Sequence, residues 1–268
     1  MINWNFHTHS SYCDGKDTLR ELADRAVELG FNSLGFSGHV FTDFDRDYCM
    51  SQGDTERYIA EANALKAEYS DRCRLFCGIE YDIFSSADRT CFDYVIGSVH
   101  YIKIGGRYLP VDMSPSVTSN IVKHHFGGSF DSYAKAYFEL EAEVAERTGC
   151  DIIGHIDLVS KYSEALHFGE SDAFLCAAED AVKSLVKYKK PFEINTGAIA
   201  RGARSVPYPS LDILKMIYSN GGSVTVSSDC HDKQYLDFGF DEAVLLAKRV
   251  GFKTVKKITE NGFRDIEI

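Results

Sequence analysis

Short apolar runs alternate along the chain with longer stretches whose apolar positions recur every three or four residues. The short runs predict buried strands, and the longer stretches predict amphipathic helices. We expect strands over residues 1–6, 32–37, 72–81, 92–99, 150–154, 191–195 and 223–227. We expect helices over residues 18–29, 129–148, 172–188, 209–220, 241–250 and 255–261, with a further helix that starts at Asp54.

Polar residues at the helix ends provide start and stop signals. We expect Asp17, Asp54 and Ser129 to cap the N-termini of their helices, because short polar side chains accept hydrogen bonds from the first free backbone N–H groups. Gly30 is expected just beyond the end of the first helix, where a left-handed backbone conformation favours glycine.

Two stretches lack a sustained period. Residues 40–53, rich in Asp and aromatic residues, predict either a loop over a functional site or a solvated surface loop. Residues 103–128 predict a long excursion with a small hairpin or a short helix. Within it, His124 and His125 follow no expected strand, so we expect them to support the site without binding metal, or to lie on the surface.

Seven alternations of strand and helix predict parallel strands joined by right-handed crossovers, as in α/β barrels. In such barrels the active site is built at the carboxyl ends of the strands. Proline is scarce at 5 residues, and neither a linker nor an internal repeat divides the chain. We therefore expect a single domain that spans residues 1–268.

Composition narrows the classes of function. The formal charge of −11 disfavours a polynucleotide-binding surface, which needs stripes of Lys and Arg, but leaves a small phosphorylated substrate possible. No signal peptide and no apolar run long enough to span a bilayer is visible, so we expect no membrane partner and a cytoplasmic protein. The 8 cysteines are scattered, which favours reduced core residues over disulfides or a cysteine-ligated zinc site.

Histidine or carboxylate groups follow almost every expected strand. His7 and His9 alone are compatible with surface residues, although their i, i+2 spacing directs both imidazoles to one side of a strand. The complete set is different, because neither helix packing nor solubility requires such groups at the same end of so many strands. Imidazole and carboxylate are the ligands of transition-metal sites, so the set predicts a multinuclear centre. Its candidate ligands are His7, His9, Asp14, His39, Glu80, His100, His155, Asp229 and His231.

These motifs together resemble the polymerase and histidinol phosphatase (PHP) superfamily, and within it the histidinol-phosphate phosphatases. The resemblance covers nearly the whole chain. It is carried by His7-x-His9 with Cys13-Asp14-Gly15, Gly35-x-x-Gly38-His39, Gly78-Ile79-Glu80, Gly97-Ser98-Val99-His100, Gly154-His155-x-Asp157, Glu193-x-Asn195-Thr196 and Ser228-Asp229-x-His231. Asn5 and Gly38 stand where the family often has acidic residues, which affects groups around the ligands and not the ligands themselves.

The resemblance implies a distorted (β/α)7 TIM-like barrel with a trinuclear metal centre at the C-terminal ends of the strands. The first ion would lie between His7, His9, Glu80 and Asp229. The second would share Glu80 and take His100 and His155, and the third would take Asp14, His39 and His231. We expect two to three divalent ions, and zinc, iron and manganese all accept such ligands.

A positively charged metal centre predicts a phosphomonoester hydrolase, because a hydroxide that bridges two metals can attack phosphorus while the ions hold the phosphoryl oxygens. Glu80, Asp14, Asp229 and His231 are the candidate catalytic groups. Arg201 and Lys161 are candidates for binding the substrate phosphate, with Asn195 and Arg204 as further substrate contacts, although each cation could also be a surface group.

The reaction expected first is hydrolysis of L-histidinol phosphate to L-histidinol and phosphate, a step of histidine biosynthesis. The acidic loop with Asp43, Asp45 and Asp47 is a candidate to hold the amine or imidazole of this substrate. Two alternatives stay open: a PHP phosphoesterase that acts on nucleotides or another small phosphomonoester, and a noncatalytic metal-stabilised module. The sequence leaves the oligomeric state undetermined.

Overall fold

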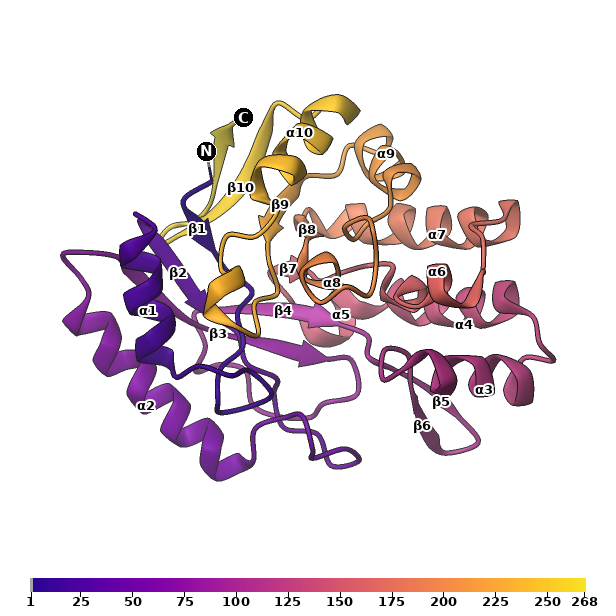
Figure 1. Ribbon diagram of the computed structural model, residues 1–268, viewed down its shortest axis with the longest axis horizontal. Helices are drawn as coiled ribbons and strands as arrows, with labels where there is room; N and C mark the ends of the chain where they lie inside the picture. The colour runs from indigo at the N-terminus through magenta and orange to yellow at the C-terminus, as the bar shows by residue number, and fades with distance from the viewer. Residues whose placement is uncertain (1) are drawn as a thin grey trace.

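A computed structural model describes residues 2–268, and within them seven parallel strands form one sheet in the order β1-β2-β3-β4-β7-β8-β9 (Figure 1). All seven expected strands are present, mostly shorter than predicted. They are β1 (Trp4–Asn5), β2 (Ser33–Phe36), β3 (Arg74–Asp82), β4 (Tyr94–Ser98), β7 (Ile152–Ile153), β8 (Phe192–Asn195) and β9 (Val224–Ser227).

The two edges of this sheet meet just beyond β1 and β9. A parallel bridge joins Thr8 to Cys230, where the His9 N–H donates to the Cys230 carbonyl at 2.8 Å and the Cys230 N–H donates to the His7 carbonyl at 3.0 Å. The sheet is therefore a nearly closed barrel, which confirms the predicted distorted (β/α)7 TIM-like fold. The closing contact uses the same two segments that carry the first and last candidate ligands.

Helices cover the outside of the barrel, with α1 and α2 on one side and α3 to α7 on the other (Figure 1). Their bounds are α1 (Leu19–Glu28), α2 (Gln52–Glu68), α3 (Pro115–His125), α4 (Phe130–Glu141), α5 (Val144–Thr148), α6 (Ser163–Leu166), α7 (Asp172–Leu185), α8 (Gly197–Ala200), α9 (Leu211–Ser219) and α10 (Phe240–Val250). Short 3-10 turns are η1 (Leu158–Ser160), η2 (Val186–Tyr188) and η3 (Lys233–Tyr235). The helix expected over residues 129–148 is divided into α4 and α5.

One strand pair departs from the expected alternation, because residues 83–93 connect β3 to β4 without a helix. The Asp82 carboxylate accepts a hydrogen bond from the Phe84 N–H at 2.8 Å, and its carbonyl accepts one from Ser85 at 2.9 Å. These turns at the end of β3 reverse the chain before a helix can begin.

Two predicted caps were wrong, and the observed ones lie one and three residues away. Thr18, not Asp17, caps α1: its hydroxyl accepts from the Glu21 N–H at 3.2 Å, while the Glu21 carboxylate accepts from the Thr18 N–H at 2.9 Å. Ser51 caps α2 in the same reciprocal way, with Asp54 as its partner inside the helix. In both cases a hydroxyl and a carboxylate three residues apart form a capping box.

The helix expected over residues 255–261 is also wrong. This segment forms the antiparallel hairpin β10 (Thr254–Thr259) and β11 (Gly262–Glu267), which pairs Thr259 with Gly262 across a two-residue loop. The three-residue spacing of Val255 and Ile258 fits a helix, but Asn261 followed by Gly262, which has a φ of +90°, favours a tight hairpin turn.

The excursion after β4 contains both elements that were expected as alternatives. The hairpin β5 (Tyr101–Ile104) and β6 (Arg107–Pro110) comes first, and α3 follows it. His124 and His125 lie exposed at the end of α3. No helix within residues 2–268 is both long and apolar enough to cross a membrane.

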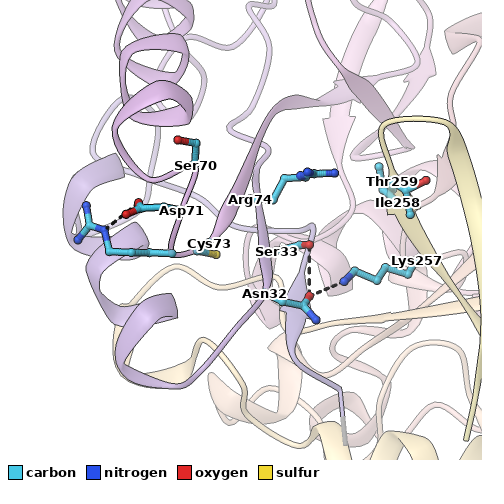
Figure 2. A pocket seen from close by; sticks show the side chains of 10 residues that line it. Asn32, Ser33, Ser70, Asp71, Cys73, Arg74, Lys257, Ile258 and Thr259 are labelled. Atoms are coloured by element: carbon cyan, nitrogen blue, oxygen red, sulfur yellow. Dashed lines mark hydrogen bonds and ion pairs between the residues drawn. The ribbon is translucent and has the colours of Figure 1, made fainter.

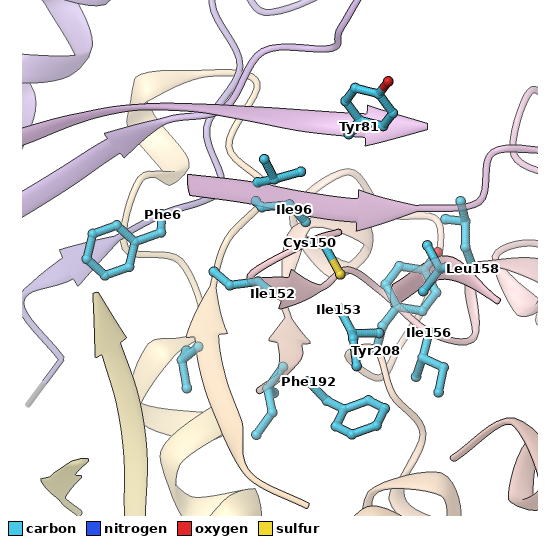
Figure 3. Close-up of a cluster of buried hydrophobic side chains, with 14 of the residues drawn as sticks. Phe6, Tyr81, Ile96, Cys150, Ile152, Ile153, Ile156, Leu158, Phe192 and Tyr208 are labelled. Carbon is cyan, nitrogen blue, oxygen red and sulfur yellow. The ribbon is translucent and has the colours of Figure 1, made fainter. Parts of the chain in front are cut away.

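Buried apolar side chains from neighbouring strands form the core on both faces of the barrel sheet (Figure 3). Ile96 of β4, Ile152 of β7 and Phe192 of β8 are at most 1 % exposed. Truncating such a side chain to alanine typically costs about 2–5 kcal/mol of stability, so this core holds the strand ends in fixed positions.

Tyr94 of β4 connects this core to the strand ends. Its hydroxyl donates to the Phe6 carbonyl at 2.6 Å and the Phe36 carbonyl at 3.1 Å, just before two of the candidate ligand segments. A Cβ at Gly35 or Gly78 would lie 2.3 Å or 2.2 Å from the Tyr94 side chain. Glycine at both positions therefore makes room for the ring that ties β1, β2 and β4 together.

Candidate metal centre

Glu80 at the end of β3 lies at the centre of the strand-end cluster. Its Oε1 atom is 2.9 Å from His155 Nε2 and 3.2 Å from His100 Nε2. Its Oε2 atom faces three other imidazoles, with distances of 3.1 Å to His39 Nδ1, 3.2 Å to His7 Nε2 and 3.4 Å to His9 Nε2. One buried carboxylate thus presents its two oxygens to two different sets of histidines, as a bridging ligand would.

Asp229 lies on the other side of the first pair of histidines. Its Oδ1 atom is 3.1 Å from His9 Nε2 and 3.5 Å from His7 Nε2. Asp229 follows β9 with a positive φ of 46°, which is uncommon for a residue with a side chain. The structure therefore brings together the four side chains expected around the first ion.

The more exposed end of the cluster is built around Asp14. Its carboxylate lies 3.2 Å from His231 Nε2 and 3.7 Å from His39 Nε2, which unites the three groups expected around the third ion. His9 adds its Nδ1 atom at 3.4 Å, a contact that was not expected. His39 is shared in a similar way, since its Nδ1 atom faces Glu80, so the three predicted ligand sets adjoin and overlap.

Two carboxylates that were not predicted as site residues hold the histidines from behind. Glu193 of β8 lies 2.5 Å from His7 Nδ1 and accepts from the His155 N–H at 3.0 Å. Asp82 lies 3.3 Å from His100 Nδ1 and accepts from the His100 N–H at 3.0 Å. Such carboxylate partners fix the tautomer and orientation of metal-binding imidazoles. Asp82 follows Glu80 at the i+2 spacing that places side chains on one side of a strand, which is the signal that could have identified it.

Buried charges control protonation in this cluster. Burial lowers the pKa of His7, but attraction to Glu193, Glu80 and Asp229 outweighs burial and raises this pKa to about 10. Burial, together with the positive charges of His9 and His100, lowers the pKa of His39 to about 3. The negative charges of Glu80 and Asp14 oppose this shift without cancelling it. The carboxylates therefore attract positive charge at the interior end of the site, while His39 stays a neutral ligand.

The donor set fits divalent transition metals. The Nε2 atoms of His7 and His9 are buried and have no hydrogen-bond partner among the described residues, yet both converge on the same carboxylate oxygens. Neutral imidazole nitrogen and carboxylate oxygen are the ligands of zinc, iron and manganese in proteins. Groups of three or four such donors with mutual distances within 4.8 Å occur four times in this cluster.

A cavity of about 180 Å³ opens over the cluster, and only two of the four candidate substrate contacts line it. Lys161 and Arg201 face the cavity, with Lys161 Nζ 3.0 Å from Asp112 Oδ2. Arg201 is bound to Asp229, since it donates 2.8 Å hydrogen bonds to both the carbonyl and the carboxylate of that residue.

The other two candidates lie behind the cavity. Arg204 is 6 % exposed and donates to Asp157 Oδ2 at 3.2 Å and to Ser160 at 2.8 Å. Asn195 is fully buried; its amide donates to Glu193 at 2.9 Å and its oxygen accepts from the Gly197 N–H at 2.9 Å. These contacts do not favour the substrate-binding role predicted for either residue.

A second cavity of about 250 Å³ adjoins the first and shares Asp14, His39, His100 and Asp112 with it. Asp45, Asp47, Tyr48 and Tyr101 line its outer part, so the loop over residues 40–53 lies beside the site. Asp45 accepts a 2.6 Å hydrogen bond from Tyr101. Asp43, His124 and His125 line neither cavity.

The amino-acid sequence is similar to that of known proteins over almost its full length. A Deinococcus radiodurans protein named "Probable histidinol-phosphatase" is 28% identical over 261 residues, which cover 93% of this chain and 94% of the relative.

Two solved structures share the fold at 20% identity. A Listeria monocytogenes protein assigned by name as a histidinol phosphatase gives a TM-score of 0.78 and covers 89% of this chain and 99% of its own. The Lactococcus lactis histidinol phosphate phosphatase, solved with zinc, L-histidinol and phosphate, gives a TM-score of 0.72 and covers 97% and 98%.

The family assignment rests on the sequence itself. The sequence model of the PHP domain family matches residues 5–197, a range that begins just before the first histidine pair and ends after β8. Because this match covers more than half of the chain, the protein belongs to the PHP domain family.

Proposed function

We propose that this protein is a metal-dependent phosphomonoester hydrolase that converts L-histidinol phosphate and water to L-histidinol and phosphate. The observation that carries the proposal is the convergence of five imidazoles on the two oxygens of Glu80, beneath a cavity that Arg201 and Lys161 line. The reaction named for the Deinococcus relative, and the zinc, L-histidinol and phosphate in the Lactococcus structure, support this choice of substrate.

Two to three divalent ions of zinc, iron or manganese are proposed for the centre. His7, His9, Glu80 and Asp229 would hold one, Glu80, His100 and His155 a second, and Asp14, His39 and His231 a third. When bound, such ions stabilise the charge of a phosphoryl group and lower the pKa of water, so that a nucleophile is available at neutral pH. Glu80, Asp14, Asp229 and His231 are the proposed catalytic groups because they fix these ions around the cavity floor.

The cations of the cavity wall would bind the phosphoryl group of the substrate. Arg201 is already oriented by its two hydrogen bonds to Asp229 and by a 2.9 Å contact with His231 Nδ1, and it lines the cavity. Lys161 is held in the same way by Asp112. Such preorganised donors bind best when negative charge accumulates on the phosphoryl oxygens, and thus favour the transition state over the ground state.

The adjoining cavity would take the rest of the substrate. Asp45, Asp47 and Asp112 give its wall a negative charge, and Tyr48 and Tyr101 give it flat apolar faces. An amine and an imidazole match this combination, whereas the additional phosphates of a nucleoside di- or triphosphate would be repelled. A phosphoesterase that acts on nucleotides or another small phosphomonoester is therefore the second candidate function. A noncatalytic metal-stabilised module is the third.

Steady-state kinetics on a panel of substrates tests the proposal. Wild-type protein with bound metal should hydrolyse L-histidinol phosphate with a higher kcat/KM than nucleoside monophosphates or sugar phosphates. A preference for a nucleotide would favour the second candidate, and no turnover of any phosphomonoester would favour the third. Under the proposal the chain is one domain over residues 1–268, acts in the cytoplasm and binds neither polynucleotide nor membrane.

A further inference from the structure

A third, polar pocket lies at the opposite end of the barrel from the metal centre. It has a volume of about 300 Å³ and lies between the beginnings of β2 and β3 and strand β10 of the C-terminal hairpin (Figure 2). Arg74 from β3 and Lys257 from β10 reach into it from its two sides (Figure 2). None of the proposed metal ligands or phosphate-binding residues lines this pocket.

The positive charge of Lys257 is poorly compensated. Its ammonium hydrogen-bonds the Asn32 side-chain oxygen and lies 5.1 Å from the centre of the Trp4 ring, but no carboxylate of residues 2–268 is within ion-pair distance of it. In the hairpin it stands directly opposite Arg264, and like charges in that position destabilise a strand pair. Burial, together with the charges of Arg74 and Arg264, lowers the pKa of Lys257, although Cys73 opposes them.

The neighbouring Lys256, by contrast, has a carboxylate partner. It projects to the other face of the hairpin, where it forms a 2.8 Å ion pair with Asp265, the residue paired with it across the strands. Arg74 has a single carboxylate partner, Glu260, at 3.2 Å, and both side chains of that pair are largely exposed. The pocket lining contains three cations, Arg72, Arg74 and Lys257, and one carboxylate, Asp71, which lies 3.8 Å from Arg72. The lining therefore has a net positive charge in a protein that is acidic as a whole.

From this geometry we propose that the pocket between β2, β3 and β10 binds a tetrahedral oxyanion of the size of phosphate. The Arg74 guanidinium offers a planar pair of N–H donors and the Lys257 ammonium a point charge, a combination suited to phosphoryl oxygens. Asn32 adds an amide NH2 group, because its oxygen already accepts from Lys257 and Ser33. Binding would relieve the repulsion among Arg74, Lys257 and Arg264 and join the C-terminal hairpin to the barrel.

Trp4 provides a local readout, since it is the single tryptophan of the chain and lies against Lys257. Its fluorescence is measured during titration of the intact, metal-loaded protein with inorganic phosphate, at constant ionic strength with chloride as the counter-ion. Wild-type protein should give a saturable change. Lys257→Gln and, separately, Arg74→Gln should weaken the apparent affinity about tenfold or more, as expected when a charge-assisted hydrogen bond is lost.

Two further variants sharpen the test. Lys256→Gln removes a lysine from the opposite face of the same strand and should leave the titration unchanged. Glu260→Gln frees Arg74 from its carboxylate and should tighten binding. Hydrolysis at the metal centre should be unaffected in all four variants, because none of these residues lines that cavity.

A parallel titration with methylphosphonate distinguishes the source of the oxyanion. Tighter binding of methylphosphonate supports the pocket as a site for the phosphoryl group of a metabolite, and tighter binding of phosphate supports it as a site for the free ion. The absence of a saturable change in wild-type protein, or an identical midpoint in Lys257→Gln and Arg74→Gln, would overturn the proposal. Arg74 is exposed, so its variant tests the site even if Lys257→Gln folds poorly.

Discussion

Thr8 and Cys230 form the bridge that closes the barrel, and each lies between two candidate metal ligands. His7 and His9 flank Thr8, and Asp229 and His231 flank Cys230. On each side of this bridge, which we call the seam, three consecutive residues therefore provide both the backbone hydrogen bonds that close the barrel and the side chains that could bind metal. Ions bound there would connect the first strand of the barrel to the last.

This arrangement predicts that metal stabilises the fold. Ions that bind only the folded chain shift unfolding by mass action, and an excess of about 100-fold over Kd is worth about 2.7 kcal/mol. Thermal unfolding of the protein before chelation, after chelation and after addition of zinc or manganese measures the effect. We expect a lower Tm after chelation and recovery on metal addition; equal Tm values in all three states would contradict a metal site at the seam.

Arg201 and Arg204 should differ in the kind of loss that their removal causes. Arg201→Ala should lower kcat/KM about 10²–10³-fold for every phosphomonoester accepted, because it removes a preorganised donor to the phosphoryl group. Arg201→Lys should recover only part of this loss, since a point charge does not reproduce the planar fork.

Arg204→Ala should instead destabilise the fold by about 3–5 kcal/mol, because it leaves the buried Asp157 carboxylate without its partner. Chemical denaturation and steady-state kinetics on both variants separate the two effects. A kinetic loss confined to L-histidinol phosphate would make Arg201 a specificity residue, and an unchanged stability of Arg204→Ala would contradict the structural role of that ion pair.

Glu193→Gln should weaken metal binding without removing a ligand. The variant keeps the size of the side chain but loses the negative charge that holds His7 Nδ1, and partners of this kind typically contribute about 10–100-fold in metal affinity. Competition with a chromogenic chelator measures the affinity. Asn195→Ala is the matched comparison: it removes one hydrogen bond to Glu193 but keeps the negative charge beside His7, and should cost less. A larger loss of metal affinity in Asn195→Ala than in Glu193→Gln would contradict the role of Glu193 in holding His7.

Glu141 in α4 should make stability fall as pH rises. Both of its carboxylate oxygens are buried without a hydrogen-bond partner in the described chain, and burial raises its pKa well above the ordinary value. The folded chain then keeps a proton that the unfolded chain releases above pH ~4.5, so this group loses up to about 1.4 kcal/mol of stability per pH unit between the two pKa values.

Denaturation of Glu141→Gln at several pH values tests this sign. The variant should gain stability relative to wild type as pH rises from about 5 to about 8. Glu139→Gln, at an exposed position in the same helix, should show no such trend. A constant difference between Glu141→Gln and wild type across this range would mean that Glu141 is ionised in the folded protein.

The strand ends were predictable from sequence because parallel strands bring their carboxyl ends to one rim, wherever the helices lie. His39, Glu80 and His155 could therefore be assigned to one site without knowledge of their contacts. The direction of a loop side chain has no such periodic signal. Arg201 and Arg204 look equivalent in sequence, yet one lines the cavity and the other is buried behind it.

The remaining errors have a similar origin in local ambiguity. Val255 and Ile258 are three residues apart, which fits the helical period, but pairing with residues 262–267 makes the segment a strand. In the sequence, Glu193 is only one residue of a short buried strand. Its role in orienting an imidazole depends on contact with His7, which lies 186 positions away. Asp112 belongs to an irregular segment, so no periodic pattern predicts its ion pair with Lys161.

Hydrolysis of L-histidinol phosphate by wild-type protein and by Glu80→Ala, with the metal content of each sample measured alongside, tests the central claim most directly. Glu80 connects the two sets of histidines, so we expect metal-loaded wild-type protein to turn over the substrate and the folded variant to be nearly inactive and depleted of metal. Ser98→Ala, which removes only a 2.7 Å hydrogen bond to Glu80, should retain most activity. Wild-type kcat in a Glu80→Ala sample with full metal content would contradict the account.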